Sequence, residues 1–381
     1  MRIAMIGTRG VPARYGGFET AIEEVGQRLV RAGHEVTVYC RRAPGQEALD
    51  EYLGMRLVTL PAVRQRALET LSHTTLSVLH ASLDRRPDAA LVFNAANAPL
   101  LPVLRARAIP VATHVDGLEW KRAKWGRRAK QYYQRAEAMS VHWSDALIAD
   151  AEGIADYYWE KFSAPTRLIS YGAPRVAADP SALEGTGLLP RAYHLVVARF
   201  EPENHVAEIV EGYSASGARH PLVVVGGAPY GEAYTKRVHG AADDRVRFLG
   251  SVWDQHLLDQ LYANSLVYWH GHSVGGTNPS LLRAMGAGAS TNAFDVSFNR
   301  EVLRDSGAYW STPQDVARRA EEAEWDTVTT AARGRASLVE SERYDWDDVA
   351  AAYEQLCSDL ATGRVAEPLR TTTPVSEVLA P

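Results

Sequence analysis

The chain has 381 residues, 46% of them hydrophobic and 23% charged, with a formal net charge of -5 at pH 7. These values predict two ordinary globular domains and argue against general nucleic-acid binding. The two cysteines, Cys40 and Cys357, give neither a disulfide framework nor zinc-ligand spacing, and the apolar start of the chain ends at Gly7, too early for a signal peptide. We therefore expect a cytoplasmic protein.

Short apolar runs alternate with helix-length segments along the whole chain. In the first half these runs are 3–6, 36–40, 57–60, 90–93, 111–114 and 147–149, and in the second half they are 195–197, 222–225, 246–249, 266–269 and 291–293. Strands separated by helices in this way are typical of parallel α/β sheets. We expect two doubly wound, Rossmann-like domains facing across a cleft.

The expected domain bounds follow from this alternation. The amino-terminal domain covers residues 1–175, the carboxyl-terminal domain covers 176–345, a last helix at about 346–362 packs on the first domain, and the tail 363–381 is disordered. The Pro- and Gly-rich stretch 173–191 is the expected linker. Asp345-Trp-Asp347 begins the last helix, where aspartates favour the helix dipole, so we do not interpret it as a metal-binding motif.

The first strand leads into a glycine-rich loop that runs to Thr20. A nicotinamide-binding turn needs closely spaced glycines directly before a helix, but here Pro12 and a further extension intervene, and Arg41 replaces the acid expected on an NAD ribose. A solvated loop with a helix cap at Thr20 is one interpretation. In the other, the loop places Gly16, Gly17 and Glu19 in the cleft between the domains, and Arg9 and Arg14 are available to an anionic ligand.

The predicted strand 111–114 ends in His114-Val-Asp-Gly117. Side chains alternate along a strand, so His114 and Asp116 point to the same side at the edge of the cleft. A buried Asp116 that only caps the Gly117 turn is the alternative.

The stretch from Trp120 to Arg135 is basic and aromatic and contains no acid. Such a surface fits anionic lipid headgroups or a pyrophosphate, with aromatic rings at the headgroup boundary. The residues expected to form this patch are Trp120, Lys121, Arg122, Lys124, Trp125, Arg127 and Arg128. The alternative is a solvated helix whose aromatic side chains pack inward.

Two segments of the second half predict a phosphate site. Arg199 follows a strand, where its charge could meet a bound phosphate, although a surface ion pair with Glu201 or Glu203 is the alternative. Further on, Gly275 and Gly276 form a turn between a strand and a helix that begins near Pro279. Amides around Thr277, Asn278 and Ser280 would face the phosphate, unless the turn is purely structural.

Four segments together resemble the rhamnosyltransferase-like branch of the family 4 glycosyltransferases. They are 1–20 (MRIAMIGTRGVPARYGGFET), 114–121 (HVDGLEWK), 198–204 (ARFEPEN) and 275–282 (GGTNPSLL). The resemblance implies a GT-B fold, a nucleotide-sugar donor held mainly by the carboxyl-terminal domain, and transfer with retention of configuration. Members of this branch commonly use dTDP-linked L-rhamnose and extend a lipid-linked sugar in surface polysaccharide assembly.

The chain departs from the wider family at two positions. Asn204 stands where the family has a lysine, so the phosphate clamp depends on Arg199 and the amides near Thr277. Arg283 stands where the family has a glutamate that accepts hydrogen bonds from a ribose, and arginine has only donors. Arg283 could contact phosphate or an acidic neighbour instead. Two consequences of the replacement remain open, namely altered donor binding and reduced activity. A dTDP sugar lacks the 2'-hydroxyl and should tolerate this change best.

The resemblance also implies how the transfer works. In retaining enzymes of this fold the leaving phosphate helps to deprotonate the acceptor, so we expect Asp116 to contact the acceptor hydroxyl and His114 the donor sugar or phosphate. We expect no metal, because His270 and His272 have no cysteine or carboxylate nearby to complete a site.

The sequence thus predicts a hexosyltransferase with a nucleotide-sugar co-substrate and a lipid-linked saccharide acceptor, peripheral on the inner face of the membrane and without a nucleic-acid partner. The alternatives are a nucleotide-dependent oxidoreductase and, given Arg283, a non-catalytic sugar-nucleotide binder.

Overall fold

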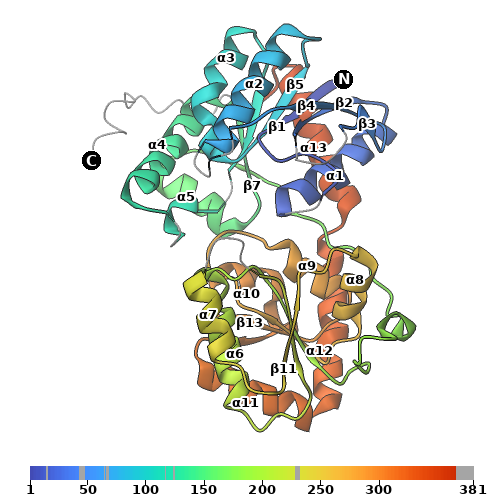
Figure 1. Ribbon diagram of the computed structural model, residues 1–381. Helices are drawn as coiled ribbons and strands as arrows, with labels where there is room; N and C mark the ends of the chain where they lie inside the picture. Colours follow the sequence, from blue (N-terminus) through green and yellow to red (C-terminus); the bar gives the residue numbers. More distant parts are fainter. Residues whose placement is uncertain are drawn as a thin grey trace. The chain divides into compact units, whose positions relative to one another are not determined.

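The computed structural model divides into two compact units (Figure 1). The first comprises Met1–Tyr171 and the segment that begins at Trp346, and the second comprises Gly172–Asp345. The structure describes residues 1–13, 16–42, 48–63, 65, 68–115, 117–122, 125–227 and 232–365. The chain passes from the first unit to the second between Tyr171 and Gly172 and returns between Asp345 and Trp346.

The first unit is built on a mostly parallel sheet. Its described strands are β1 (Arg2–Ile6), β2 (Glu35–Arg41), β3 (Glu51–Tyr52), β4 (Met55–Leu60), β5 (Ala89–Phe93), β6 (Val111–His114), β7 (Ala146–Ala149) and β8 (Arg167–Leu168), in the order β3-β4-β2-β1-β5-β6-β7-β8. The pair β3 and β4 is antiparallel and the others are parallel. Every residue of β5 is buried, as expected for a central strand with helices on both faces.

The helices described in the first unit are α1 (Gly17–Arg31), α2 (Glu69–Leu83), α3 (Leu101–Ala106), α4 (Arg127–Trp143), α5 (Glu152–Phe162) and α13 (Trp346–Ala361). The last of these, α13, packs beside α1 although more than 300 residues separate them (Figure 1). Arg28 Nε donates to Asp347 Oδ1 at 2.6 Å, and His34 Nε2 lies 2.9 Å from Glu354 Oε1. The return of the last helix to the first unit is confirmed, and Asp347 serves there in an ion pair.

The second unit is built on a parallel sheet with β11-β10-β9-β12-β13-β14 as its described order. Its strands are β9 (His194–Val197), β10 (Leu222–Val225), β11 (Val246–Gly250), β12 (Val267–His270), β13 (Thr291–Phe294) and β14 (Ala308–Trp310). Its described helices are α6 (Val206–Ser214), α7 (Glu232–Gly240), α8 (Gln255–Ala263), α9 (Pro279–Gly286), α10 (Ser297–Leu303), α11 (Pro313–Trp325) and α12 (Thr327–Glu340).

Both sheets contain the same strand order. The runs β4-β2-β1-β5-β6-β7 and β11-β10-β9-β12-β13-β14 each follow the 3-2-1-4-5-6 order of a doubly wound Rossmann-like sheet, so this part of the prediction is confirmed. The order reverses between β1 and β5 in the first unit and between β9 and β12 in the second. We call these two places switch points, and ligands of such sheets bind there, outside the carboxyl ends of the strands.

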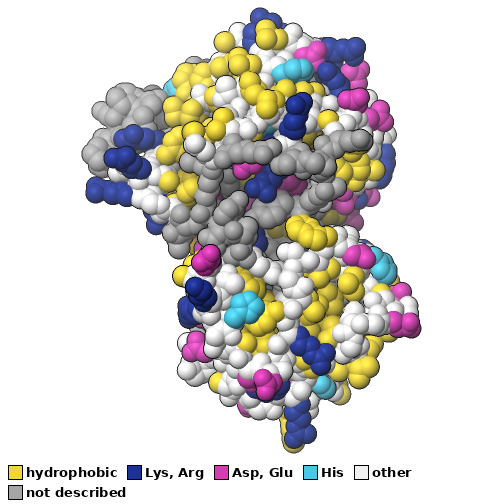
Figure 2. All heavy atoms as spheres, viewed as in Figure 1, with side chains coloured by type: hydrophobic (Ala, Val, Ile, Leu, Met, Phe, Trp, Pro, Cys, Tyr) yellow, Lys and Arg dark blue, Asp and Glu magenta, His cyan; other side chains and the backbone are white. Residues whose placement is uncertain are grey.

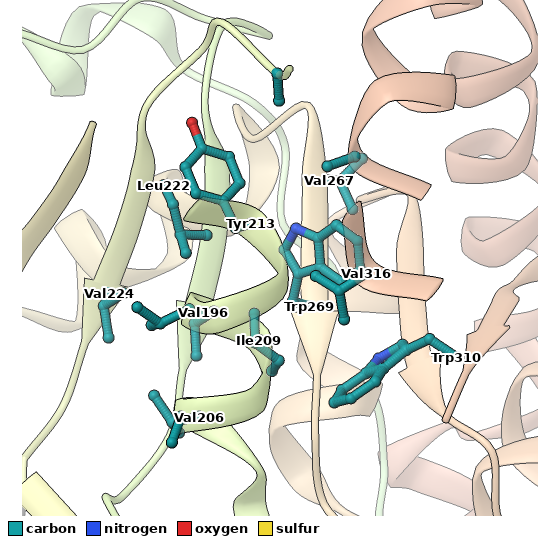
Figure 3. Packing of buried hydrophobic residues seen from close by; sticks show 14 of the residues in the cluster. Val196, Val206, Ile209, Tyr213, Leu222, Val224, Val267, Trp269, Trp310 and Val316 are labelled. Atoms are coloured by element: carbon teal, nitrogen blue, oxygen red, sulfur yellow. The ribbon is translucent and has the colours of Figure 1, made fainter. Parts of the chain in front are cut away.

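The core of the second unit fixes the strands that meet at its switch point. Figure 3 shows Trp269 of β12 and Trp310 of β14 packed in one cluster with Val316 of α11 and with Val206 and Ile209 of α6. Each of these side chains is at most 1% exposed. Burial of one such side chain stabilises the fold by about 1.5–3 kcal/mol. These contacts therefore hold the strands in place against α6 and α11.

The segment 173–191 is not a linker, which corrects the prediction. Val176 N donates to Gly286 O at 3.1 Å, and Leu183 and Leu188 are buried in the second core with Tyr193. Its prolines and glycines do prevent long regular elements, but its two leucines bury apolar surface and hold it on the second unit. The crossing at Tyr171 also lies earlier than the predicted boundary at 175.

Candidate functional site

The switch point of the second unit brings together the two segments that the sequence singled out. Arg199 and Asn204 lie on the loop after β9, and the glycine-rich turn lies on the loop after β12, the strand that pairs with β9. Arg199 is exposed. These loops leave neighbouring strands at their carboxyl ends, where a doubly wound sheet holds its ligand.

Asn204 joins the two loops. Its Nδ2 donates to Arg199 O at 2.8 Å, and its Oδ1 lies 2.9 Å from His272 Nδ1. A second link is made by Ser273, whose amide donates to Glu203 O at 2.9 Å. Since an amide oxygen only accepts, Nδ1 of His272 carries a proton. At the position where a lysine was expected, the chain therefore has a buried bridge between loops.

Gly271 makes this close approach possible. A Cβ atom there would overlap the carbonyl group of Asn204, so only glycine fits between the two loops. Neither Gly271 nor His272 was predicted for this role. Gly275, with φ of +138°, turns the chain next to His272 Nε2, and the adjoining Gly276 and Thr277 are buried.

The beginning of α9 uses its polar side chains for capping. Asn278 is the N-cap residue, and its Oδ1 accepts from Ser280 N at 2.9 Å and from Ser280 Oγ at 2.7 Å. Ser280 was predicted to offer its amide to a phosphate, but that amide is already bonded to Asn278, which corrects the prediction for this group. Pro279 occupies the first turn as predicted.

His270 at the end of β12 is a neutral hydrogen-bond acceptor. Tyr268 OH donates to Ser280 Oγ at 3.1 Å, so it accepts from His270 Nδ1, also at 3.1 Å. This leaves the lone pair on His270 Nε2, which is buried and has no partner among the described residues. Burial lowers the pKa of His270 to about 3. A buried acceptor without a partner is costly, and a ligand hydroxyl would satisfy it.

Arg283 is held by an acidic neighbour. Its Nη1 pairs with Asp259 Oδ1 of α8, and the two side chains are 20% and 21% exposed. The sequence left a phosphate or an acidic neighbour open as the contact of Arg283, and in the structure Arg283 contacts the acidic neighbour. The ion pair joins α8 to α9 behind the glycine-rich turn.

In the first unit, His114 is at the carboxyl end of β6 and only 2% exposed. Its ring stacks on Phe93 with centroids 5.7 Å apart and contacts Phe18 and Tyr171. Burial lowers the pKa of His114 to about 3, so the ring is neutral, and its Nδ1 has no partner among the described residues. Asp116, its expected catalytic companion, lies outside the described residues.

Glu19, one of the residues predicted to enter the cleft, is bonded within its own loop. It is 9% exposed and its Oε1 accepts from Arg9 N at 3.0 Å, which fastens the loop to α1. Burial raises the pKa of this carboxyl group. Gly16, at φ of +101°, is the N-cap, so α1 begins at Gly17 and not at Thr20. The Arg9 guanidinium lies 4.0 Å from Glu69, and Arg14 is outside the described residues.

The basic and aromatic patch divides into an inner and an outer part. Glu119, one residue before the predicted stretch, pairs with Arg122 Nε at 2.5 Å and accepts from Trp125 Nε1 at 3.0 Å. These two residues therefore turn toward a buried carboxylate, which corrects the prediction for them.

The outer part consists of Lys121, Arg127 and Arg128, which are exposed, while Lys124 lies outside the described residues. Trp120 is partly buried, with the Lys121 ammonium 5.6 Å from its ring centre. Figure 2 shows basic side chains gathered over α4, beside an apolar region. Among the described residues, no helix is long and apolar enough to cross a membrane.

Comparison with known proteins agrees with this architecture. Residues 16–172 match the model of the glycosyl transferase 4-like domain. Sucrose-phosphate synthase of Thermosynechococcus elongatus is 18% identical with a TM-score of 0.80, covering 95% of this chain and 99% of its own. HepE of Anabaena, solved with UDP-glucose, is 16% identical with a TM-score of 0.75, covering 94% and 100%. The chain has the GT-B fold.

A third solved structure extends the comparison. The trehalose-phosphate synthase of Burkholderia vietnamiensis is 12% identical to this GT-B chain with a TM-score of 0.69, and the match covers 95% of this chain and 100% of that one. No curated protein matches the sequence. In the described part of the GT-B chain, no group of three or more His, Cys, Asp or Glu side chains is placed to hold a metal ion.

Proposed function

We propose that this GT-B protein is a glycosyltransferase that holds the diphosphate of a nucleotide sugar at the switch point of its second unit. The observation that carries the proposal is the bridge from Asn204 to His272. It aligns the loop that carries Arg199 with the loop that carries the glycine-rich turn. Catalysis of such a transfer consists largely of placing fixed dipoles and cations where the leaving group gains charge.

A donor hydroxyl then meets a neutral acceptor. His270 presents the lone pair of its Nε2, whereas Arg283 has only donors and is paired with Asp259. We propose dTDP-L-rhamnose as the donor, on the strength of the sequence resemblance. UDP-glucose is the second candidate, because HepE of Anabaena was solved with it.

We further propose that transfer proceeds with retention and without a metal ion. The acceptor would be a lipid-linked saccharide, approached from the membrane surface through Lys121, Arg127 and Arg128. Support for this step comes from their exposure together with the basic and aromatic composition around them.

A ligand screen tests the proposal directly. The melting temperature is measured with dTDP, UDP, GDP and NADP, since a ligand that binds the native state raises it. We expect dTDP or UDP to raise the melting temperature and NADP to leave it unchanged. Stabilisation by NADP alone would contradict a glycosyltransferase and favour the oxidoreductase.

Hydrolysis of the nucleotide sugar tests the role of Arg199. The Arg199→Ala variant should hydrolyse the donor about a hundredfold more slowly, which is typical for loss of a group that stabilises transition-state charge. Arg237→Ala is the matched control, because it removes an arginine of the same unit that is 52% exposed and paired with Glu208 at 2.9 Å. Equal rates in the two variants would exclude Arg199 from the phosphate clamp.

A further inference from the structure

A polar hollow lies in the second unit, away from its switch point. It has a volume of about 450 Å³ and follows the edge strand β14, with walls from α10, α11 and α12. In the order of the sheet, β13 separates β14 from the strands of the switch point. Three arginines line the hollow, namely Arg300, Arg319 and Arg333.

The two carboxylates that line the hollow are already neutralised by other groups. Asp295 forms a two-pronged ion pair with Arg300, at 2.5 and 2.7 Å. Asp315 caps α11 by accepting from Thr312 N at 3.1 Å, and it also pairs with Arg318 at 3.1 Å. Neither acid is therefore available to the remaining two arginines.

Arg319 and Arg333 carry the surplus positive charge. Arg319 Nη1 pairs with Glu322 at 3.0 Å, but Arg318 shares that carboxylate at 2.9 Å. Arg333 has no carboxylate within 4.0 Å among the described residues, and its side-chain hydrogen bond to Thr330 Oγ1 is long, at 3.5 Å. The Nε atoms of Arg319 and Arg333 are buried and have no acceptor there.

Arg333 is a cation without a carboxylate partner among the described residues. Its pKa is lowered by burial and by the neighbouring charge of Arg319, while Glu322 and Asp326 compensate only in part. A partly buried guanidinium without a counter-ion is unfavourable, because desolvation is not repaid by an ion pair. Its planar fork of donors matches the oxygens of a phosphate.

We propose that the hollow along β14 is an anion site in which Arg319 and Arg333 bind a phosphate group of a small molecule. The phosphate could be inorganic or belong to a phosphorylated metabolite, and a volume of about 450 Å³ is ample for either. The site is distinct from the proposed donor site and does not depend on it, because the two lie at different strands of the sheet.

Phosphate titration of the full-length protein tests the site, with inorganic phosphate and glucose 1-phosphate as probes and potassium chloride of equal ionic strength as reference. We expect either phosphate to bind and to raise the melting temperature, and Arg333→Met to weaken binding at least about tenfold, as the loss of a charged hydrogen-bond donor does. Arg319→Met, a second variant, should weaken binding similarly. Tighter binding of glucose 1-phosphate than of inorganic phosphate would identify an organic phosphate as the occupant.

Three control measurements distinguish phosphate binding along β14 from binding at the donor site and from ionic screening. If the anion binds along β14, Arg199→Ala should still bind phosphate. If instead Arg199→Ala no longer binds phosphate while Arg333→Met binds it fully, the phosphate belongs to the donor site and the proposal is overturned. Arg237→Met, an exposed arginine elsewhere in the unit, should change nothing. Without phosphate, Arg333→Met should be at least as stable as the wild type. A less stable variant would show that Arg333 has a structural role. An equal rise of the melting temperature with potassium chloride would show simple ionic screening. Either result would overturn the proposal.

Discussion

Asn204 Oδ1 accepts a hydrogen bond from His272 Nδ1 at 2.9 Å and thereby couples the loops that follow two neighbouring parallel strands. The same side chain donates to Arg199 O, so one amide fixes both the backbone beside the expected phosphate-binding cation and the orientation of an imidazole. A lysine at this position could donate but could not accept from His272. In this chain, the charge of the family's lysine is therefore replaced by two hydrogen bonds of Asn204 that fix the positions of the loops.

Replacement of Asn204 by alanine should loosen both loops. Two hydrogen bonds are lost and His272 Nδ1 loses its acceptor, so we expect the free energy of unfolding to fall by about 1–3 kcal/mol. The affinity for dTDP or UDP should fall about tenfold, since the phosphate-facing groups are no longer aligned. Urea denaturation and calorimetric titration measure the two effects.

Asn264→Ala is the matched control for that variant. Asn264 is also buried in the second unit, but its Nδ2 bonds to Gln260 O at 3.0 Å on α8, away from the two loops. It should lose comparable stability and keep the nucleotide affinity. If both variants bind nucleotide equally well, the bridge has no part in ligand binding.

The ion pair of Arg283 with Asp259 can be tested by reversing it. Arg283→Glu places two carboxylates side by side on α9 and α8, and we expect it to lower the free energy of unfolding by about 1–2 kcal/mol, between the values for exposed and buried pairs. Asp259→Arg together with Arg283→Glu should recover most of that loss. Urea denaturation of the single and double variants measures the coupling, and a double variant as unstable as the two singles added together would exclude a structural role for the pair.

The buried strands and the doubly wound class of the sheets were accessible from sequence, because each buried strand is a compact apolar run bounded by helix-length segments. The edge strand β14 escaped prediction, because its three residues, Ala308–Trp310, give no periodicity. The phosphate-binding candidate Arg199 was found from its place after a strand, and Asn204 was found from the family resemblance. Long-range pairing was not accessible in this way, since nothing near Arg283 in the sequence points to Asp259.

Two further roles could not be predicted, because they too depend on contacts that form only in the folded chain. The composition of the basic stretch predicts an exposed surface, whereas its inner residues pair with Glu119, which stands just outside the stretch. From the sequence, His270 was considered only as a metal ligand, a role that we did not expect, and no other role was predicted for it. Its role as an acceptor depends on Tyr268 and Ser280, and the direction of those hydrogen bonds is defined only when the strand and the helix are placed together.

The buried imidazole of His270 predicts a pH dependence of stability. Its pKa in the folded protein is about 3, against an ordinary value of 6.5. Below pH 6.5 the unfolded chain binds a proton that the folded chain does not, so stability falls as pH falls, by about 1.4 kcal/mol per pH unit for this residue. The loss continues until the pH nears the folded value.

His270→Gln removes this titration. Glutamine is uncharged throughout, so the free energy of unfolding of the variant should decline less steeply than that of the wild type between pH 6.5 and 5. The comparison of slopes is independent of any constant loss that the substitution causes. His194 is also buried with a lowered pKa and keeps its contribution in both proteins, as does Glu324, whose pKa of about 2 affects a lower range. Identical slopes would mean that His270 is protonated in the folded state.

The division of the basic patch leads to opposite expectations for its arginines. Arg127 and Arg128 are exposed at the start of α4, so their combined replacement by glutamine should weaken binding to vesicles that contain anionic lipid. With about 1 kcal/mol per basic residue near such a surface, the expected loss is about 25-fold. Stability should stay unchanged, because exposed residues of this kind contribute little to folding.

Arg122→Gln should show the reverse pattern. Arg122 is only 15% exposed and pairs with a carboxylate that is 10% exposed, so its loss leaves Glu119 buried without its cation. We expect a lower melting temperature and a vesicle affinity close to that of the wild type, measured by cosedimentation with anionic and with zwitterionic vesicles. A variant that keeps its stability but loses vesicle binding would place Arg122 on the lipid-facing surface after all. If the Arg127 and Arg128 double variant bound both kinds of vesicle as the wild type does, α4 would not be part of that surface.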